Sequence, residues 1–180
     1  MEKGHLKIIT VLIVLGVSLG LLLGIQKYYN HSFVEGPVMH DLEQLAFAES
    51  VTVNKDTGVY DFKVQIKQAG NIQYEYAKID GIIKNELKGK DYQLTLLDHR
   101  SPKLRKNLEN MELGIYEAMA KNNFLWLDET FRQAANDNNF SYKLFIDDKR
   151  LYIQMADQDY FLYEIIERTT APTGVQDKGE

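Results

Sequence analysis

A hydrophobic run near the N-terminus, residues 8–25, contains no charged residue. At about 1.5 Å of rise per helical residue, about 18 residues span roughly 27 Å, which is close to the thickness of a bilayer's hydrocarbon core. Lysines precede and follow the run. The pattern therefore predicts a transmembrane helix over residues 8–26, after a short N-terminal segment, residues 1–7.

The same run favours a retained anchor over a cleaved signal peptide. The hydrophobic region of a signal peptide is usually about 7 to 15 residues long and ends in small residues of an A-x-A-like pattern. This run is longer, and it ends in Leu23-Gly24-Ile25 followed by Gln26 and Lys27. The chain has no cysteine, which excludes a lipid attached to one.

Basic residues around the run predict its orientation. Lys3 and Lys7 precede it, whereas only Lys27 closely follows it. Cytoplasmic flanks of membrane helices collect lysine and arginine, so we expect the N-terminus inside and the larger C-terminal part outside. Tyr28 and Tyr29 suit the outer membrane interface, where an aromatic ring with a polar tip is stable.

Three glycines lie at steps of four within the run: Gly16, Gly20 and Gly24. This spacing puts them on one helix face, where two helices can approach closely and gain packing contacts. Transmembrane packing through this face, and hence a homodimer, is one interpretation. The other is that glycine is simply common in membrane helices.

Composition limits what the external part can bind. The first 26 residues hold two lysines and one glutamate, so the rest of the 180-residue chain carries a net charge of −6. An acidic exterior argues against nucleic acid as a partner. Without cysteine there is no disulfide, thiol nucleophile or thiolate metal site. No histidine pair has the spacing of metal ligands, so we predict no metal and no cofactor.

Local patterns divide the external part into segments. Residues 27–50 are predicted to form a linker and a membrane-proximal helix, residues 51–168 an α+β domain, and residues 169–180 a disordered tail. Ser101-Pro102 is a strong helix start, with serine as the N-cap and proline in the first turn. The expected elements are helices over 38–48, 72–87, 102–119 and 124–135, a hairpin over 51–67, and strands over 92–98, 140–146, 151–156 and 160–166.

Helices and strands cluster along the chain rather than alternating strictly, which indicates the α+β class. We therefore expect one transmembrane helix followed by a single, mostly antiparallel sheet with helices on one face. The other face of that sheet is then exposed or covered by a partner.

One triplet, Asp98-His99-Arg100, suggests a ligand site. It follows a predicted strand and precedes a helix start, where free backbone N–H groups and an arginine can hold an anion. The alternative is a turn in which Asp98 pairs with Arg100 or caps the helix.

Aromatic residues gather in the last three predicted strands. Tyr152, Tyr160, Phe161 and Tyr163 make the final strands apolar on both faces. Either these strands are covered on both sides, or one face meets a partner protein. We take the four residues as candidates for partner binding, with a covered core strand as the alternative.

No catalytic motif stands out: the serines do not sit in G-x-S-x-G or S-x-x-K, and no glycine cluster matches a phosphate-binding loop. The sequence favours a non-enzymatic, single-pass domain of the cell envelope that binds a protein partner or itself. The alternative is a domain that binds or senses a small ligand, peptide or glycan through a partner membrane protein. A hydrolase using scattered carboxylates is the third hypothesis, with Asp98 and His99 as its first test positions.

Overall fold

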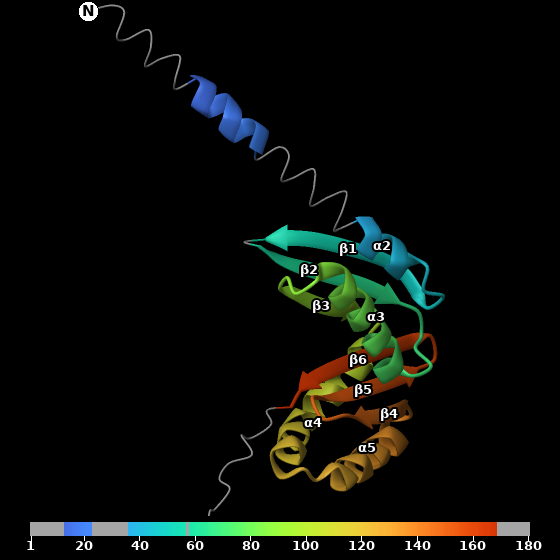
Figure 1. Cartoon of the computed structure of the whole chain (residues 1–180). Coiled ribbons are helices and arrows are strands. Elements are labelled where there is room, and N and C mark those ends of the chain that lie inside the picture. The colour runs from blue at the N-terminus through green and yellow to red at the C-terminus, as the bar shows by residue number, and fades with distance from the viewer. Residues whose placement is uncertain (1–12, 23–35, 57, 169–180) are drawn as a thin grey trace, which may run out of the picture.

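The computed structural model describes residues 13–22, 36–56 and 58–168 (Figure 1). Residues 1–7, 27–35 and 169–180 lie outside the described residues, and so do the ends of the predicted transmembrane segment. The elements after residue 35 follow the order helix, two strands, helix, strand, two helices and three strands. They are α2 (Gly36–Glu43), β1 (Ala48–Asp56), β2 (Val59–Ile66), α3 (Ile72–Leu87), β3 (Tyr92–Leu97), α4 (Pro102–Lys121), α5 (Phe124–Asn138), β4 (Ser141–Ile146), β5 (Arg150–Asp157) and β6 (Tyr160–Glu167).

Residues 13–22 are helical, and their large apolar side chains are exposed. None of the helices within the described ranges combines the length and the hydropathy needed to cross a membrane. At Gly16 and Gly20 an added Cβ atom would meet no other atom within 4 Å. Gly24 lies outside the described residues.

Within the part of the chain that the structure describes, six strands form two sheets rather than the single sheet that we expected. In the first sheet the order is β1-β2-β3, with β1 antiparallel and β3 parallel to β2. The second is an antiparallel meander in the order β4-β5-β6. The α+β class and the mostly antiparallel pairing are confirmed. The single sheet was a wrong prediction, because β4, β5 and β6 form a separate sheet. Helix α3 is the crossover that makes β3 parallel to β2.

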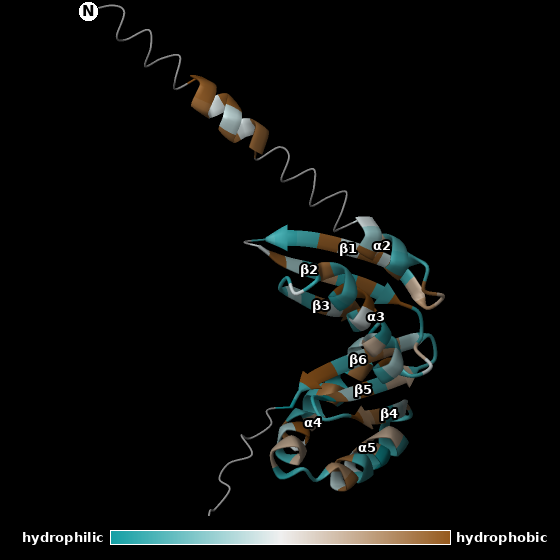
Figure 2. Ribbon diagram, viewed as in Figure 1, coloured by the Kyte–Doolittle hydropathy of each residue, from teal (hydrophilic) through white to brown (hydrophobic). Residues whose placement is uncertain are grey.

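Two hydrophobic cores lie on opposite faces of the second sheet. The first core joins α2, α3 and the inner face of the first sheet, and it also includes Tyr152 and Tyr163. The second core fills the space between α4, α5 and the other face of the second sheet. Helices therefore do not lie on one face of one sheet, as we expected, but pack as two separate groups (Figures 1 and 2).

Helix α2 belongs to the first core rather than to a linker. Val38 and Leu42 are fully buried, and Leu45 beyond the helix end is almost so. Helix α2, which we expected to join the membrane-proximal segment to the domain, thus packs in the same core as the strands that follow it. The sequence pattern showed the helix, but its apolar stripe is as compatible with a membrane surface as with a core.

The outward face of the first sheet is open. Thr52, Lys63 and Gln93 are exposed there, whereas Tyr60, Phe62 and Val64 of β2 are fully buried on the opposite face. Alternation along a strand sends successive side chains to opposite faces, so one polar face and one apolar face result.

Capping residues mark the ends of the helices, and the cap at the start of α4 is the one that the sequence predicted. Ser101 accepts a hydrogen bond from the backbone N–H of Leu104, which caps the start of α4 as its sequence indicates. Asn71 does the same for α3 through the N–H of Tyr74. Asn122 and Asn139 take the left-handed conformation that ends α4 and α5. These caps fix where the strands on either side begin.

Candidate functional site

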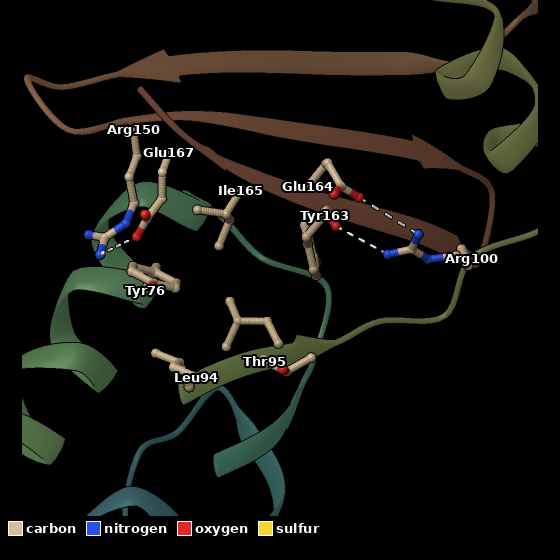
Figure 3. A pocket seen from close by; sticks show the side chains of 10 residues that line it. Tyr76, Leu94, Thr95, Arg100, Arg150, Tyr163, Glu164, Ile165 and Glu167 are labelled. Carbon is tan, nitrogen blue, oxygen red and sulfur yellow. Dashed lines mark hydrogen bonds and ion pairs between the residues drawn. The ribbon is translucent and has the colours of Figure 1, made fainter. Parts of the chain in front are cut away.

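A hollow of about 280 Å³ separates β3 from β6 (Figure 3), and we call it the edge cleft. Residues from α3, from β3 and the segment after it, and from β5 and β6 line it: Tyr76, Leu94, Thr95, Leu96, Arg100, Arg150, Tyr163, Glu164, Ile165 and Glu167. The edge cleft thus lies where the outermost strand of one sheet faces the outermost strand of the other.

A second hollow, of about 420 Å³, continues the edge cleft along α3 and the start of β3. We call it the side hollow. It shares four lining residues with the edge cleft, and it adds Asp80, Lys84, Tyr92 and Gln93. The shared residues are Tyr76, Leu94, Arg150 and Glu167. Together the two hollows follow the free edge of β3.

The edge of β3 that faces the cleft has unpaired backbone groups. Tyr60 of β2 donates its N–H to the carbonyl of Asp91, which fixes the hydrogen-bonding side of the parallel pair. Backbone groups alternate in direction along a strand, so those of Leu94 and Leu96 point away from β2. Among the described residues, no strand pairs with this edge of β3.

The facing edge of β6 is closed at one end and open at the other. Phe161 donates its N–H to the carbonyl of His99 at 3.0 Å, in an isolated antiparallel bridge. By the same alternation, the backbone groups of Tyr163, Ile165 and Glu167 face the cleft. Beyond Tyr163, β6 therefore offers Ile165 as a free backbone position opposite β3.

Asp98 and Arg100 close the bridged end of the cleft. Arg100 donates three hydrogen bonds to the Asp98 carboxylate, the shortest at 2.7 Å. Its fourth goes to the carbonyl of Tyr163, while Asp98 accepts the N–H of that residue at 2.9 Å. These hydrogen bonds to Asp98 raise the pKa of Arg100. The side chains of Asp98 and Arg100 therefore hold β6 in place through Tyr163.

The predicted ligand triplet therefore has internal partners. The Asp98 side chain is only 4% exposed and satisfied by Arg100 and Tyr163. The His99 ring packs against Tyr160, with centroids 4.8 Å apart. The alternative that we gave, a turn in which Asp98 pairs with Arg100, describes the observed contacts. Of the three residues, only Arg100 lines the edge cleft.

Arg150 lies where the two hollows meet, and its guanidinium makes fewer close polar contacts than that of Arg100. It stacks over the Tyr76 ring at 4.9 Å, and its Nη2 is 3.7 Å from a carboxylate oxygen of Glu167. The Arg150 side chain is 18% exposed and that of Glu167 is 83% exposed. A guanidinium has five N–H donors, so Glu167 and the neighbouring Tyr152 hydroxyl together still leave donors for a bound acceptor.

Hydrogen bonds to Asp147 hold the turn that carries Arg150. Asp147 accepts the backbone N–H groups of Lys149 and Arg150, both at 2.7 Å, and the Tyr152 hydroxyl at 2.8 Å. Burial would raise the pKa of Asp147, but these hydrogen bonds lower it on balance. Burial and the bond to Asp147 raise the pKa of Tyr152 to about 12. The backbone of Arg150 is therefore fixed, although its side chain keeps free donors.

Asp80 in the wall of the side hollow is already satisfied. It accepts hydrogen bonds from Lys84 at 2.5 Å and from the Tyr92 hydroxyl. Burial would raise the pKa of Asp80, but these two hydrogen bonds lower it on balance, so the group is ionised at neutral pH. Burial, followed by the bond to Asp80, raises the pKa of Tyr92. The hydrogen bond from Tyr92 to Asp80 thus fixes the Tyr92 side chain, which projects from the start of β3, in the wall of the side hollow.

The four aromatic candidates for partner binding divide into two pairs. Tyr152 and Tyr163 are almost fully buried in the first core, so the covered-strand alternative describes these two. Tyr160 is 41% exposed beside His99, and Phe161 is partly buried against the first core. Tyr163 nevertheless reaches the cleft wall.

Comparison with protein-family models, curated proteins and solved structures found no match for this chain.

Sequence reasoning missed Arg150, Tyr76 and Glu167 as neighbours in one site. Arg150 was part of a polar turn, Tyr76 part of a helical stripe, and Glu167 the end of a strand. Tyr76 and Arg150 are 74 positions apart in the sequence, and only the packing of α3 against the second sheet brings them together. No local signal marks such a pair.

Proposed function

We propose that this protein is a single-pass, membrane-anchored domain of the cell envelope that binds an extended segment of a partner protein in the edge cleft. Residues 8–26 cross the membrane with the N-terminus inside, and residues 36–168 are displayed outside. The hydropathy of the run and the lysines before it support the anchor. The described part of that run, residues 13–22, is helical with exposed apolar side chains.

The observation that carries the binding proposal is the pair of free strand edges on the two sides of one cleft. Leu94 and Leu96 on β3, and Ile165 on β6, direct backbone groups into it. An added strand satisfies such groups by main-chain hydrogen bonds, as in proteins that bind peptides by strand addition. A segment between β3 and β6 would pair with one sheet or with both.

A peptide fits this cleft better than a compact small molecule. Ligand pockets usually measure about 300 to 1,000 Å³ and are mostly apolar. The edge cleft is not mostly apolar, because charged side chains line both of its ends. Its continuation along β3 into the side hollow suits an elongated ligand.

Co-purification of the full-length protein from its native membrane tests this function. In the test variant, Ile165→Pro removes a cleft-facing N–H and puts a ring where the added strand would lie. Ile146→Pro is the matched control, because the backbone of Ile146 faces the far edge of β4. We expect a partner to be retained by the wild type and the control, and lost from Ile165→Pro.

Two outcomes contradict the proposal. One is a partner that remains equally bound to the Ile165→Pro variant while thermal unfolding shows that the variant is folded. The other is a wild-type protein that retains no partner and stays monomeric in detergent. Recovery of a second copy of this chain, lost on Ile165→Pro, would identify the partner as the protein itself.

A further inference from the structure

The charged side chains of the edge cleft favour one chemical kind of bound segment, provided that the cleft binds an extended segment as proposed above. We infer that Arg150 selects an extended segment carrying an aspartate or glutamate side chain, which forms an ion pair with the guanidinium where the edge cleft meets the side hollow. The position of Arg150, its remaining N–H donors and the charges around it support this selectivity.

Arg150 lines both hollows, so a segment that follows the free edge of β3 passes its side chain. Tyr76 stacks beneath the guanidinium, and the Asp147 turn holds the backbone. A guanidinium held in this way loses little conformational freedom when it binds a planar carboxylate.

A comparison with Arg100 shows why Arg150 is the receptor. Arg100 makes four hydrogen bonds within the protein, three of them to the almost fully buried Asp98. Arg150 has one ion pair, at the longer distance of 3.7 Å, and its partner Glu167 is largely exposed. A carboxylate bound to Arg100 would have to displace an internal partner. One bound to Arg150 competes with the exposed Glu167 and shares the guanidinium with the Tyr152 hydroxyl.

The carboxylate belongs to a side chain within the segment rather than to a chain end. The hollow continues on both sides of Arg150, toward Thr95 and Tyr163 in one direction and toward Lys84 and Tyr92 in the other. A bound segment can therefore extend past Arg150 in both directions. Strand pairing favours such a through-running segment, because each added residue gains backbone hydrogen bonds.

The charges nearest Arg150 favour an acidic residue at this position over a basic one, while Glu164, at the other end of the edge cleft, lies 3.8 Å from Arg100. Asp80 is bound to Lys84 and Tyr92 and is not free to receive a cation. A lysine beside Arg150 would meet like charge in a partly desolvated site. Glu167 offsets the charge of Arg150 in the empty cleft and can turn outward, since its side chain is 83% exposed.

The test is a selection from displayed random 12-residue peptides on the full-length protein in lipid nanodiscs. Three proteins are compared: wild type, Arg150→Gln and Glu167→Gln. We expect wild-type peptides to share an acidic residue at one position of an alternating pattern. Replacing that residue by its amide should weaken binding to the wild type about tenfold or more, and leave binding to Arg150→Gln unchanged. The Glu167→Gln variant should bind the acidic peptide about two- to threefold more tightly.

The outcomes separate this inference from the function on which it rests. Peptides that need a free Ile165 edge but show no acidic preference, or keep it with Arg150→Gln, overturn the selectivity and leave strand binding intact. The absence of any peptide that Ile165→Pro displaces overturns both. Thermal unfolding of each variant in the same nanodiscs shows that it is folded before its binding is interpreted.

Discussion

Asp98 and Arg100, two residues apart, form an ion pair that holds both backbone groups of one residue on a distant strand. The carboxylate accepts the N–H of Tyr163, and the guanidinium donates to its carbonyl. The pair thus replaces the rung of a β-ladder with side chains. It joins the segment after β3 to β6 at one end and leaves the rest of the two strand edges separate.

The first prediction concerns this pair. Asp98→Asn should lower the free energy of unfolding by about 2 to 4 kcal/mol, because the almost fully buried carboxylate that holds Arg100 and the Tyr163 N–H loses its charge. Denaturant unfolding of the full-length protein measures the change. Asp159→Asn, at an exposed turn, is the matched control and should change stability by less than about 0.5 kcal/mol. Equal losses of unfolding free energy at both positions would show that the Asp98–Arg100 pair does not stabilise the fold.

The Tyr163 hydroxyl is a second link between the two halves of the fold. It accepts the N–H of Ala69 at 2.6 Å and lies 3.3 Å from the carbonyl of Lys67. Tyr163→Phe should cost about 1 to 2 kcal/mol and speed hydrogen exchange at the Ala69 amide. Tyr160→Phe, which removes an exposed hydroxyl from the same strand, should leave that amide unchanged. If exchange at Ala69 were unaffected by Tyr163→Phe, the link would be absent in solution.

Acid should weaken the turn between β4 and β5 through Asp147. The hydrogen bonds at this turn lower its folded-state pKa below the ordinary value of 3.8, so the unfolded chain binds the proton more readily. The stabilising contribution is therefore complete above pH 3.8 and is lost as pH falls toward the lower folded-state pKa. Unfolding followed from pH 6 to pH 2.5 should show a smaller acid-dependent loss in Asp147→Asn than in wild type. Its neighbour variant Asp148→Asn, in the same turn but exposed, should retain the wild-type slope.

Two helix glycines should respond differently to alanine. Gly81 lies inside α3 with open space around it, so Gly81→Ala should stabilise the fold by about 0.5 to 1 kcal/mol through helix propensity. At Gly114 in α4, an added Cβ would lie 3.3 Å from the Trp126 ring, which has to shift. Gly114→Ala should therefore gain less than Gly81→Ala in thermal unfolding. A larger gain at Gly114 would mean that Trp126 does not pack there.

Local structure was largely predictable from the sequence, because local rules set it. The Ser101-Pro102 start of α4, the apolar stripe of α3 and the closing three-stranded meander all appear where their patterns predicted them. Cap residues and side-chain periodicity act within a few positions of the chain, and so they can be read from one sequence.

Pairing between distant segments was not predictable in the same way. Nothing local shows that β3 returns parallel to β2, or that the strands divide into two sheets instead of one. The same holds for the edge cleft. Asp98, His99 and Arg100 form a recognisable triplet in the sequence. The role of Asp98 and Arg100, however, depends on Tyr163, more than 60 positions later. Arg150 gave no signal, because its neighbours Tyr76 and Glu167 come from other elements.

Amide hydrogen exchange tests the central claim most directly. The full-length protein in nanodiscs is compared with and without a saturating amount of a peptide selected on it. If an extended segment pairs with the strand edges in the cleft, the amides of Leu94, Leu96 and Ile165 should be the ones whose exchange slows most. Unchanged exchange at all three, with protection confined to the outer edge of β1 or to α4 and α5, would contradict the account.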